Sequence, residues 1–184
     1  MAFPPAHFLV GAGFADLVGA ILPLPKWKSR LIAGSLAVLP DLDIVLGLLD
    51  SHAGTAYHGT FTHSLFAVVV VGLLGGLLAG KAWGVLAGTA YGSHLLVDLL
   101  DDRGRTNVLL GWPFSDEYPF AIARIFPMVP FRHGGGALQA ALSLFEPRVF
   151  EQLAIQTLVG AAMLVLLLVV ARLLRRVRER LGAA

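Results

Sequence analysis

Long apolar stretches alternate with short polar breaks along the chain. The pattern predicts five membrane-spanning helices, over about 6–24, 31–49, 64–80, 82–100 and 153–171, each near the ~20 residues that cross a bilayer. The last segment contains no charged side chain and ends against the basic stretch RLLRRVRER at 172–180. The sequence therefore predicts an all-α, polytopic membrane helix bundle.

The second predicted segment contains a break. Residues 39–43 read LPDLD, and Pro40 removes a backbone donor and disfavours helical geometry at Leu39. Irregular backbone at membrane depth is stable only where it is buried in protein or lines a polar cavity. We therefore expect a broken helix whose turn presents Asp41 and Asp43 to a polar site.

Three parts of the chain are distinguished on this basis. Residues 1–115 are predicted to form a helical membrane core that carries the site, and 153–184 a transmembrane anchor with a basic cytoplasmic tail. Between them, 116–152 is predicted to be an extracytoplasmic segment with interfacial helices, because YPFAIARIFPMVPF and ALQAALSLF are typical of pieces that lie on a bilayer.

Glycines recur every four residues in the third and fourth predicted segments. The positions are Gly72, Gly76 and Gly80, followed by Gly84, Gly88 and Gly92. Small residues at this spacing allow the backbones of two helices to approach closely. We expect the two segments to pack against each other along these stripes.

Composition supports the membrane interpretation. The chain is 57% hydrophobic and only 14% charged, whereas soluble domains carry about 25% charged residues. There is no cysteine, which excludes thiolate metal sites, a cysteine nucleophile and disulfides. The first residues, MAFPPAHF, lack a basic n-region, so we expect them to belong to the mature fold rather than to a signal peptide.

The basic residues predict the orientation. They cluster between the first and second segments, at Lys81 between the third and fourth, and in the 172–180 tail. Five alternating crossings place all three clusters on one side, which the positive-inside rule identifies as the cytoplasm. The N-terminus, residues 50–63 and residues 101–152 are then outside. The net charge is +2, but the basic residues flank apolar segments and do not cover one face of a domain. They therefore indicate membrane topology, and no nucleic-acid partner is predicted.

Ionisable residues inside the predicted segments are candidates for function. His94 and Asp98 are four residues apart, on one helical face, within reach of one ion. No lysine or arginine lies in the second, third or fourth segment to pair with Asp41 and Asp43, which makes a metal ion the natural counter-charge. The role of Asp16 in the first segment stays open between capping, pairing and lining a cavity.

Further histidines fall on the same predicted side of the membrane. His7 precedes the first segment, and His58 and His63 stand at the outer end of the third, where Thr62 is expected to cap the helix. Imidazoles and carboxylates from four segments thus converge. They predict a site for one or two divalent ions, with Zn²⁺ as the first choice and Mn²⁺ or Mg²⁺ as alternatives.

Five short motifs, taken in order, resemble one family. AHFLVG (6–11), LPDLD (39–43), HGTFTHS (58–64), YGSHLLVD (91–98) and WPFS (112–115) resemble the YdjM/YbcI-type family of predicted membrane-bound, metal-dependent hydrolases of the bacterial and archaeal inner membrane. The resemblance covers roughly residues 6–115. It implies metal ligation by His7, Asp41, Asp43, His58, His63, His94 and Asp98, and it implies no particular substrate.

The chain departs from the family pattern at three places. Relatives usually read His-Arg-Gly-x-Thr-His-Ser, and here Gly59 and Thr60 replace the Arg-Gly pair. If that arginine holds an anionic group, Arg103 or Arg105 must replace it. Ile44 and Gly111 stand where many members have a histidine and a leucine.

The leading hypothesis is metal-assisted hydrolysis at the outer leaflet, on a lipid or lipid-linked phosphate. A bound ion lowers the pKa of water toward ~7, and Asp43, Asp98 and Ser115 are the catalytic candidates, with Asp43 as the base. Ser115, Arg103 and Arg105 would position the substrate. One alternative is a transporter or channel for a divalent metal or protons, and another is a non-catalytic scaffold stapled by metal. The oligomeric state is not predicted.

Overall fold

The computed structural model describes residues 3–43, 58–101, 106, 108–127 and 145–182. The helices are α1 (Pro4–Ile21), α2 (Lys26–Val38), α4 (Leu65–Ala79), α5 (Lys81–Asp98) and α7 (Pro147–Gly182), with two 3₁₀ turns, η1 (Leu39–Leu42) and η2 (Phe61–His63). Within these ranges the structure contains no strand beyond an isolated bridge between Asp101 and Phe126. The predicted all-α class is confirmed.

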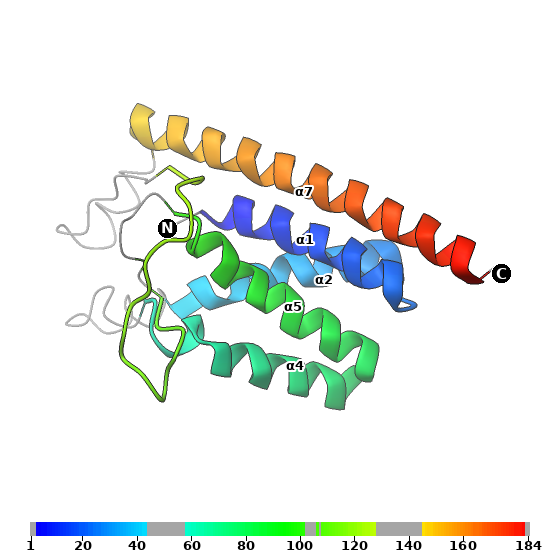
Figure 1. Cartoon of the computed structure of the whole chain (residues 1–184). Coiled ribbons are helices and arrows are strands. Elements are labelled where there is room, and N and C mark those ends of the chain that lie inside the picture. Colours follow the sequence, from blue (N-terminus) through cyan, green and yellow to red (C-terminus); the bar gives the residue numbers. More distant parts are fainter. Residues whose placement is uncertain (1–2, 44–57, 102–105, 107, 128–144, 183–184) are drawn as a thin grey trace.

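Helix α1 lies at the centre of the bundle. It packs against α2, α5 and α7, while α4 packs on α5 on the side away from α7 (Figure 1). Close contacts hold the centre together. A Cβ atom on Gly11 of α1 would lie 2.5 Å from the Ala37 Cβ atom, and one on Gly160 of α7 would lie 3.0 Å from the Ala6 Cα atom.

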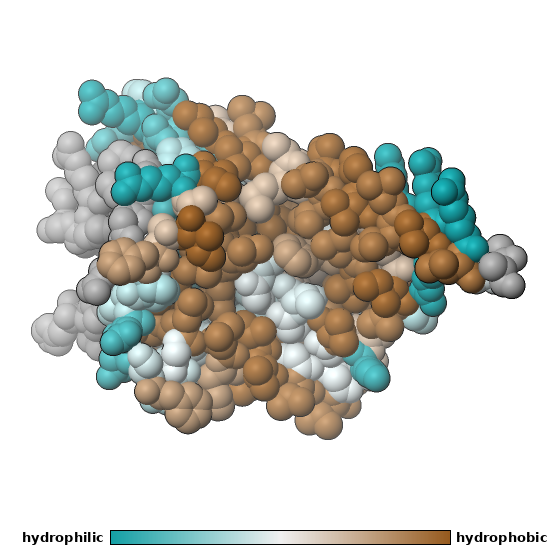
Figure 2. Space-filling model, viewed as in Figure 1, coloured by the Kyte–Doolittle hydropathy of each residue, from teal (hydrophilic) through white to brown (hydrophobic). Residues whose placement is uncertain are grey.

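The two ends of the bundle differ in character. One end, called the basic end here, holds the α1–α2 turn, the α4–α5 turn and the end of α7, and it therefore carries Lys26, Lys28, Arg30, Lys81 and the 172–180 tail (Figure 1). The opposite end, called the site end, holds the start of α1, η1, η2, the end of α5 and residues 108–127. Hydrophilic residues gather at both ends and hydrophobic ones dominate between them (Figure 2). The predicted clustering of basic residues at one end is confirmed.

Fewer helices than predicted are long and apolar enough to cross a membrane. Among the described residues, α1 and α7 are long and apolar enough to cross a membrane, and α4 is apolar but has only 15 residues. Five crossings are not confirmed by this measure, because α2 ends after 13 residues. Yet α4 buries none of its residues, and Leu77 and Leu78 are 83% and 85% exposed. An exposed surface as apolar as that of α4 is typical of contact with lipid.

The break in the second segment is confirmed. Helix α2 ends at Val38, and η1 continues the chain as a tight turn that contains a buried Pro40. The absent proline donor explains why regular helix stops there. Residues 44–49 of the predicted segment lie outside the described residues.

The predicted cap of the third segment is wrong. Ser64, not Thr62, caps α4, because its hydroxyl accepts a hydrogen bond from the Ala67 N–H at 3.1 Å. Thr62 lies in η2, and its hydroxyl donates to Asp43 Oδ2 instead. Both residues have a suitable hydroxyl, and the position of the 3₁₀ turn decides between them.

The first predicted interfacial piece, 118–131, contains no helix in its described part, 118–127. Residues 118–127 run back over the helix ends at the site end, where the Ile122 and Phe126 N–H groups donate to the carbonyls of Leu99 and Leu100. Phe126 is fully buried against Ala6, Val10 and Val97. Prolines interrupt this stretch and a large side chain goes inward, so no helix forms. Residues 137–144 of the second predicted piece lie outside the described residues.

A buried amide in the last segment ties this loop to the bundle. Gln156 of α7 is fully buried. Its Oε1 atom accepts from the Phe3 N–H, and its Nε2 atom donates to the Pro127 carbonyl, both at 2.7 Å. Both halves of a costly buried amide are thus satisfied, and three distant segments are held at the site end.

The glycine stripes on α4 and α5 face each other as predicted, and they give a first test. A Cβ atom on Gly84 would lie 2.7 Å from the Gly76 Cα atom, whereas one on Gly88 would lie 3.5 Å from the Gly72 Cα atom. We expect Gly84→Ala to destabilise the protein by about 1–3 kcal/mol relative to Gly88→Ala, because overpacking forces the backbones apart. Unfolding midpoints in one detergent measure this, and equal midpoints for the two variants would contradict it.

Candidate metal centre

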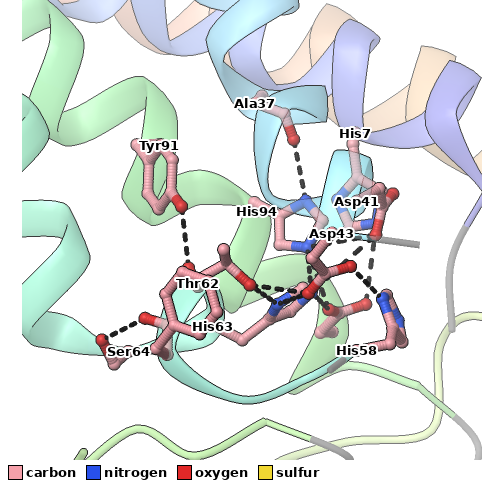
Figure 3. Close-up of polar contacts among 12 residues, drawn as sticks. His7, Ala37, Asp41, Asp43, His58, Thr62, His63, Ser64, Tyr91 and His94 are labelled. Carbon is pink, nitrogen blue, oxygen red and sulfur yellow. Dashed lines mark hydrogen bonds and ion pairs between the residues drawn. The ribbon is translucent and has the colours of Figure 1, made fainter. Parts of the chain in front are cut away.

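Four histidines and three aspartates gather at the site end, and Figure 3 labels all of them except Asp98. They come from α1 (His7), from η1 and the residue after it (Asp41, Asp43), from η2 and the residues before it (His58, His63), and from α5 (His94, Asp98). All but His58 are buried, and the rings of His7, His63 and His94 have no exposed surface. The structure therefore brings together all seven residues that the sequence singled out.

The orientation of His94 is set by a backbone carbonyl. Its Nδ1 atom lies 2.8 Å from the Ala37 carbonyl oxygen of α2. A carbonyl can only accept, so Nδ1 must carry the hydrogen and Nε2 must present a lone pair. That lone pair faces Asp98 Oδ2 at 3.2 Å and Asp41 Oδ1 at 3.7 Å.

The orientation of His63 is set by a chain of hydrogen bonds. The Thr62 hydroxyl donates to Asp43 Oδ2 at 2.6 Å and lies 2.9 Å from His63 Nδ1. Because that hydroxyl has given its hydrogen to Asp43, Nδ1 must donate to it, and in the neutral ring Nε2 is then a lone pair. The Tyr91 hydroxyl donates to the Thr62 carbonyl at 2.8 Å and holds η2 against α5.

The two imidazoles consequently aim at each other. His63 Nε2 lies 3.0 Å from His94 Nε2. Around them, Asp41 Oδ1 and both oxygens of Asp98 are buried without a hydrogen-bond partner among the described residues. Lone pairs and carboxylates in such contact repel one another unless a positive charge lies among them.

The donor set fits a divalent metal. Three sets of residues each offer ligand atoms that lie within 4.8 Å of one another. The sets are His63, His94 and Asp98; His7, Asp41 and His94; and Asp41, His58 and His63. His7 joins the set through Nε2, which is 3.6 Å from Asp98 Oδ1, and its ring stacks on His94 at 3.9 Å between centroids. Imidazole nitrogens with carboxylate oxygens suit Zn²⁺ and related ions.

Asp43 has different surroundings from the other two carboxylates. Its Oδ1 lies 2.6 Å from His58 Nδ1, and its Oδ2 accepts from Thr62 and lies 3.3 Å from His63 Nδ1. Both oxygens are thus engaged on the outer sides of two imidazoles. A carboxylate there orients a histidine and raises its basicity as a ligand.

The same contacts change the proton affinity of His63, which lies in η2, outside the membrane helices. Burial acts to lower its pKa, but Asp41, Asp43 and Asp98 outweigh that effect and raise the pKa to about 9. A divalent ion must therefore displace a proton. We expect titration calorimetry near pH 7, in two buffers of different ionisation enthalpy, to detect release of about one proton per ion, and the apparent affinity to fall about tenfold per pH unit below about 9. Identical heats in the two buffers would contradict this.

The predicted substrate-positioning residues are not joined to the cluster. The Ser115 hydroxyl accepts from the Glu117 N–H at 3.2 Å, a local turn contact, and no hydrogen bond in the described ranges links Ser115 to the seven residues. Arg103 and Arg105 lie outside the described residues. Two of the open interpretations of Asp16 are observed at the basic end. The Arg30 guanidinium binds its two oxygens at 2.7 and 3.0 Å, and Asp16 also lines a cavity.

Sequence reasoning missed three groups that orient the site, namely the Ala37 carbonyl, the Thr62 hydroxyl and Tyr91. Tyr91 precedes His94 by three residues, so helical spacing could have placed it near the site. The Thr62 and Ala37 contacts join positions 19 and 57 residues apart in the chain. No local pattern encodes such contacts.

Comparison with known proteins places the chain in a family. Searches among curated proteins and among solved structures each found no match. A family model described as YdjM inner membrane protein matches residues 1–178. That match includes the seven clustered residues, helices α1, α2, α4 and α5, and helix α7 as far as residue 178, although this last segment carries no recognisable motif. The chain therefore belongs to the YdjM inner membrane protein family.

Proposed function

We propose that this protein is a membrane-embedded, metal-dependent hydrolase whose site faces the outer side of the membrane. The observation that carries the proposal is the approach of the His63 and His94 Nε2 atoms to 3.0 Å, beside the buried, unbonded oxygens of Asp98. Such an arrangement needs a positive charge among the donors, which a proton on His63 or a bound divalent ion supplies. The number of imidazole and carboxylate donors favours the ion.

The residues divide into metal ligands and residues that orient those ligands. His63, His94 and Asp98 would hold one ion. A second position would use Asp41, either with His7 and His94 or with His58 and His63. The bound ion supplies an activated water and polarises the substrate oxygen. Asp98 has no hydrogen bond to either oxygen within the described residues, so we assign it the role of proton acceptor. Asp43, whose oxygens are engaged, would keep His58 and His63 in place.

The location of the site supports an outer-leaflet substrate. The basic end and the site end are opposite ends of the bundle (Figure 1), so five crossings with the basic end in the cytoplasm would place the site outside. Exposed Phe114 and Phe120, with Trp112 beside Phe61, lie in or against the loop at the site end. Aromatic residues favour the headgroup level of a bilayer, which suits a lipid or lipid-linked phosphate as substrate.

The transporter alternative receives less support from the interior. An ion path toward the basic end would need further polar groups between the helices. Instead, Ala15, Val18, Ala33, Leu86 and Ala90 form a buried apolar cluster in that half of the bundle. Asp16, the buried acid there, is paired with Arg30.

The test measures metal and hydrolysis together. We expect the purified protein to contain zinc or manganese by elemental analysis and to release phosphate from phosphatidic acid in mixed micelles. Chelation should abolish the activity and re-addition of the ion should restore it. A metal-loaded protein that is inactive on phosphate and carboxylate esters, yet passes the ion across proteoliposome membranes, would refute the hydrolase and favour the transporter.

A further inference from the structure

A cavity at the basic end, far from the metal centre, carries a second site. We propose that it binds a phosphate group, carried by an anionic phospholipid or free in solution. The cavity lies between α1, α2 and α7, has a volume of about 190 Å³ and is lined in part by Asp16, Gly19, Lys26, Ser29 and Arg175. Since a water occupies about 30 Å³, there is room for a phosphate group but not for a large headgroup.

The cationic side chains around this cavity outnumber its one carboxylate. Arg30 engages both oxygens of Asp16, from Nε at 2.7 Å and from Nη2 at 3.0 Å. Arg175 Nη2 is left at 3.6 Å from Asp16 Oδ1, and Lys26 has no ion pair with any described residue. Asp16 is therefore shared between Arg30 and Arg175, and with Lys26 added the cavity has an excess of positive charge.

The cavity is held in shape by contacts between the helices. Arg178, one turn beyond Arg175 on α7, donates to the Ile21 carbonyl at the end of α1 at 2.8 Å. Arg175 itself donates to the Asp16 carbonyl at 3.4 Å. The tail of α7 is thus fastened to α1, which fixes the guanidinium at the rim of the cavity before any ligand binds and lowers the cost of ordering it.

Phosphate is the anion that this chemistry favours. A guanidinium offers paired donors to phosphate oxygens, and an ammonium adds a point charge. Basic pockets between membrane helices on the cytoplasmic side match anionic headgroups. The site needs none of the residues of the metal centre, so it stands or falls independently of the proposed hydrolase.

The experiment compares two lysines on one helix in the full-length protein. Lys26 lines the cavity, whereas Lys28 does not and instead lies 5.7 Å from the Trp27 ring centroid. Native mass spectrometry with phosphatidylglycerol or phosphatidylcholine forms the lipid arm. The shift in Tm with inorganic phosphate, against chloride at equal ionic strength, forms the second arm.

We expect Lys26→Gln to lower retention of phosphatidylglycerol, or the phosphate-dependent response, about fivefold, with Lys28→Gln unchanged. A loss confined to Lys26→Gln in the lipid arm alone identifies a headgroup as the ligand. A loss confined to Lys26→Gln in the phosphate arm identifies the free anion. Equal losses in both variants would show diffuse surface attraction and overturn the proposal, as would a lack of response in both arms.

Discussion

Replacing His94 with alanine is expected to abolish metal binding. His94 Nε2 lies 3.0 Å from His63 Nε2 and 3.2 Å from Asp98 Oδ2, and it belongs to two of the three candidate ligand groups. Its loss breaks both groups that contain it and removes the paired Nε2 atoms, which leaves Asp41, His58 and His63 as one close set of three donors. We expect the affinity for the metal ion to fall by more than about 100-fold, because loss of a residue that only supports a ligand already costs up to about 100-fold. Hydrolysis should fall with it.

Ser93→Ala is the matched control for this variant. Ser93 is the next residue on α5, and its buried hydroxyl donates to the Ala90 carbonyl of its own helix at 2.6 Å. Elemental analysis of protein purified in parallel should show wild-type metal content for Ser93→Ala and a background level for His94→Ala. Full metal content in His94→Ala, with unchanged helicity by circular dichroism, would refute the assignment of His94.

The Asp43→Asn variant separates a positioning role from direct ligation. The substitution keeps the shape of the side chain but removes the charge that holds His58 and His63. Supporting carboxylates of this kind typically change metal affinity by about 10–100-fold. We therefore expect weaker binding, with full occupancy still reached at high metal concentration. A calorimetric titration measures the affinity and the stoichiometry separately.

Asp98→Asn supplies the comparison. Asp98 is buried like Asp43, but neither of its oxygens has a hydrogen-bond partner among the described residues. We expect Asp98→Asn to bind fewer ions per protein as well as to bind them more weakly, because a ligand atom is removed. If Asp43→Asn also loses stoichiometry, Asp43 is itself a ligand, as the sequence alone predicted, and the positioning role is wrong.

Local patterns in the sequence predicted several of the helices and the seven residues that cluster at the site end. Pro40 predicted the end of α2, because a missing donor interrupts a helix wherever it is placed. The four-residue spacing of His94 and Asp98 predicted a shared face, and the glycine stripes predicted the α4–α5 contact. The three basic clusters predicted that one end of the bundle would carry them. In each case the cause lies within one helix turn or at a segment boundary.

The tertiary structure alone decided how the site residues are used. Ala37 fixes the tautomer of His94 from another helix, and Thr62 donates to Asp43 instead of capping α4. Residues 118–131 were predicted to be an interfacial piece, but burial of Phe126 against α1 and α5 makes the described part, 118–127, an irregular cover. The direction of a hydrogen bond, or the burial of one ring, depends on which segments meet in space, and periodicity along the chain contains no information about that.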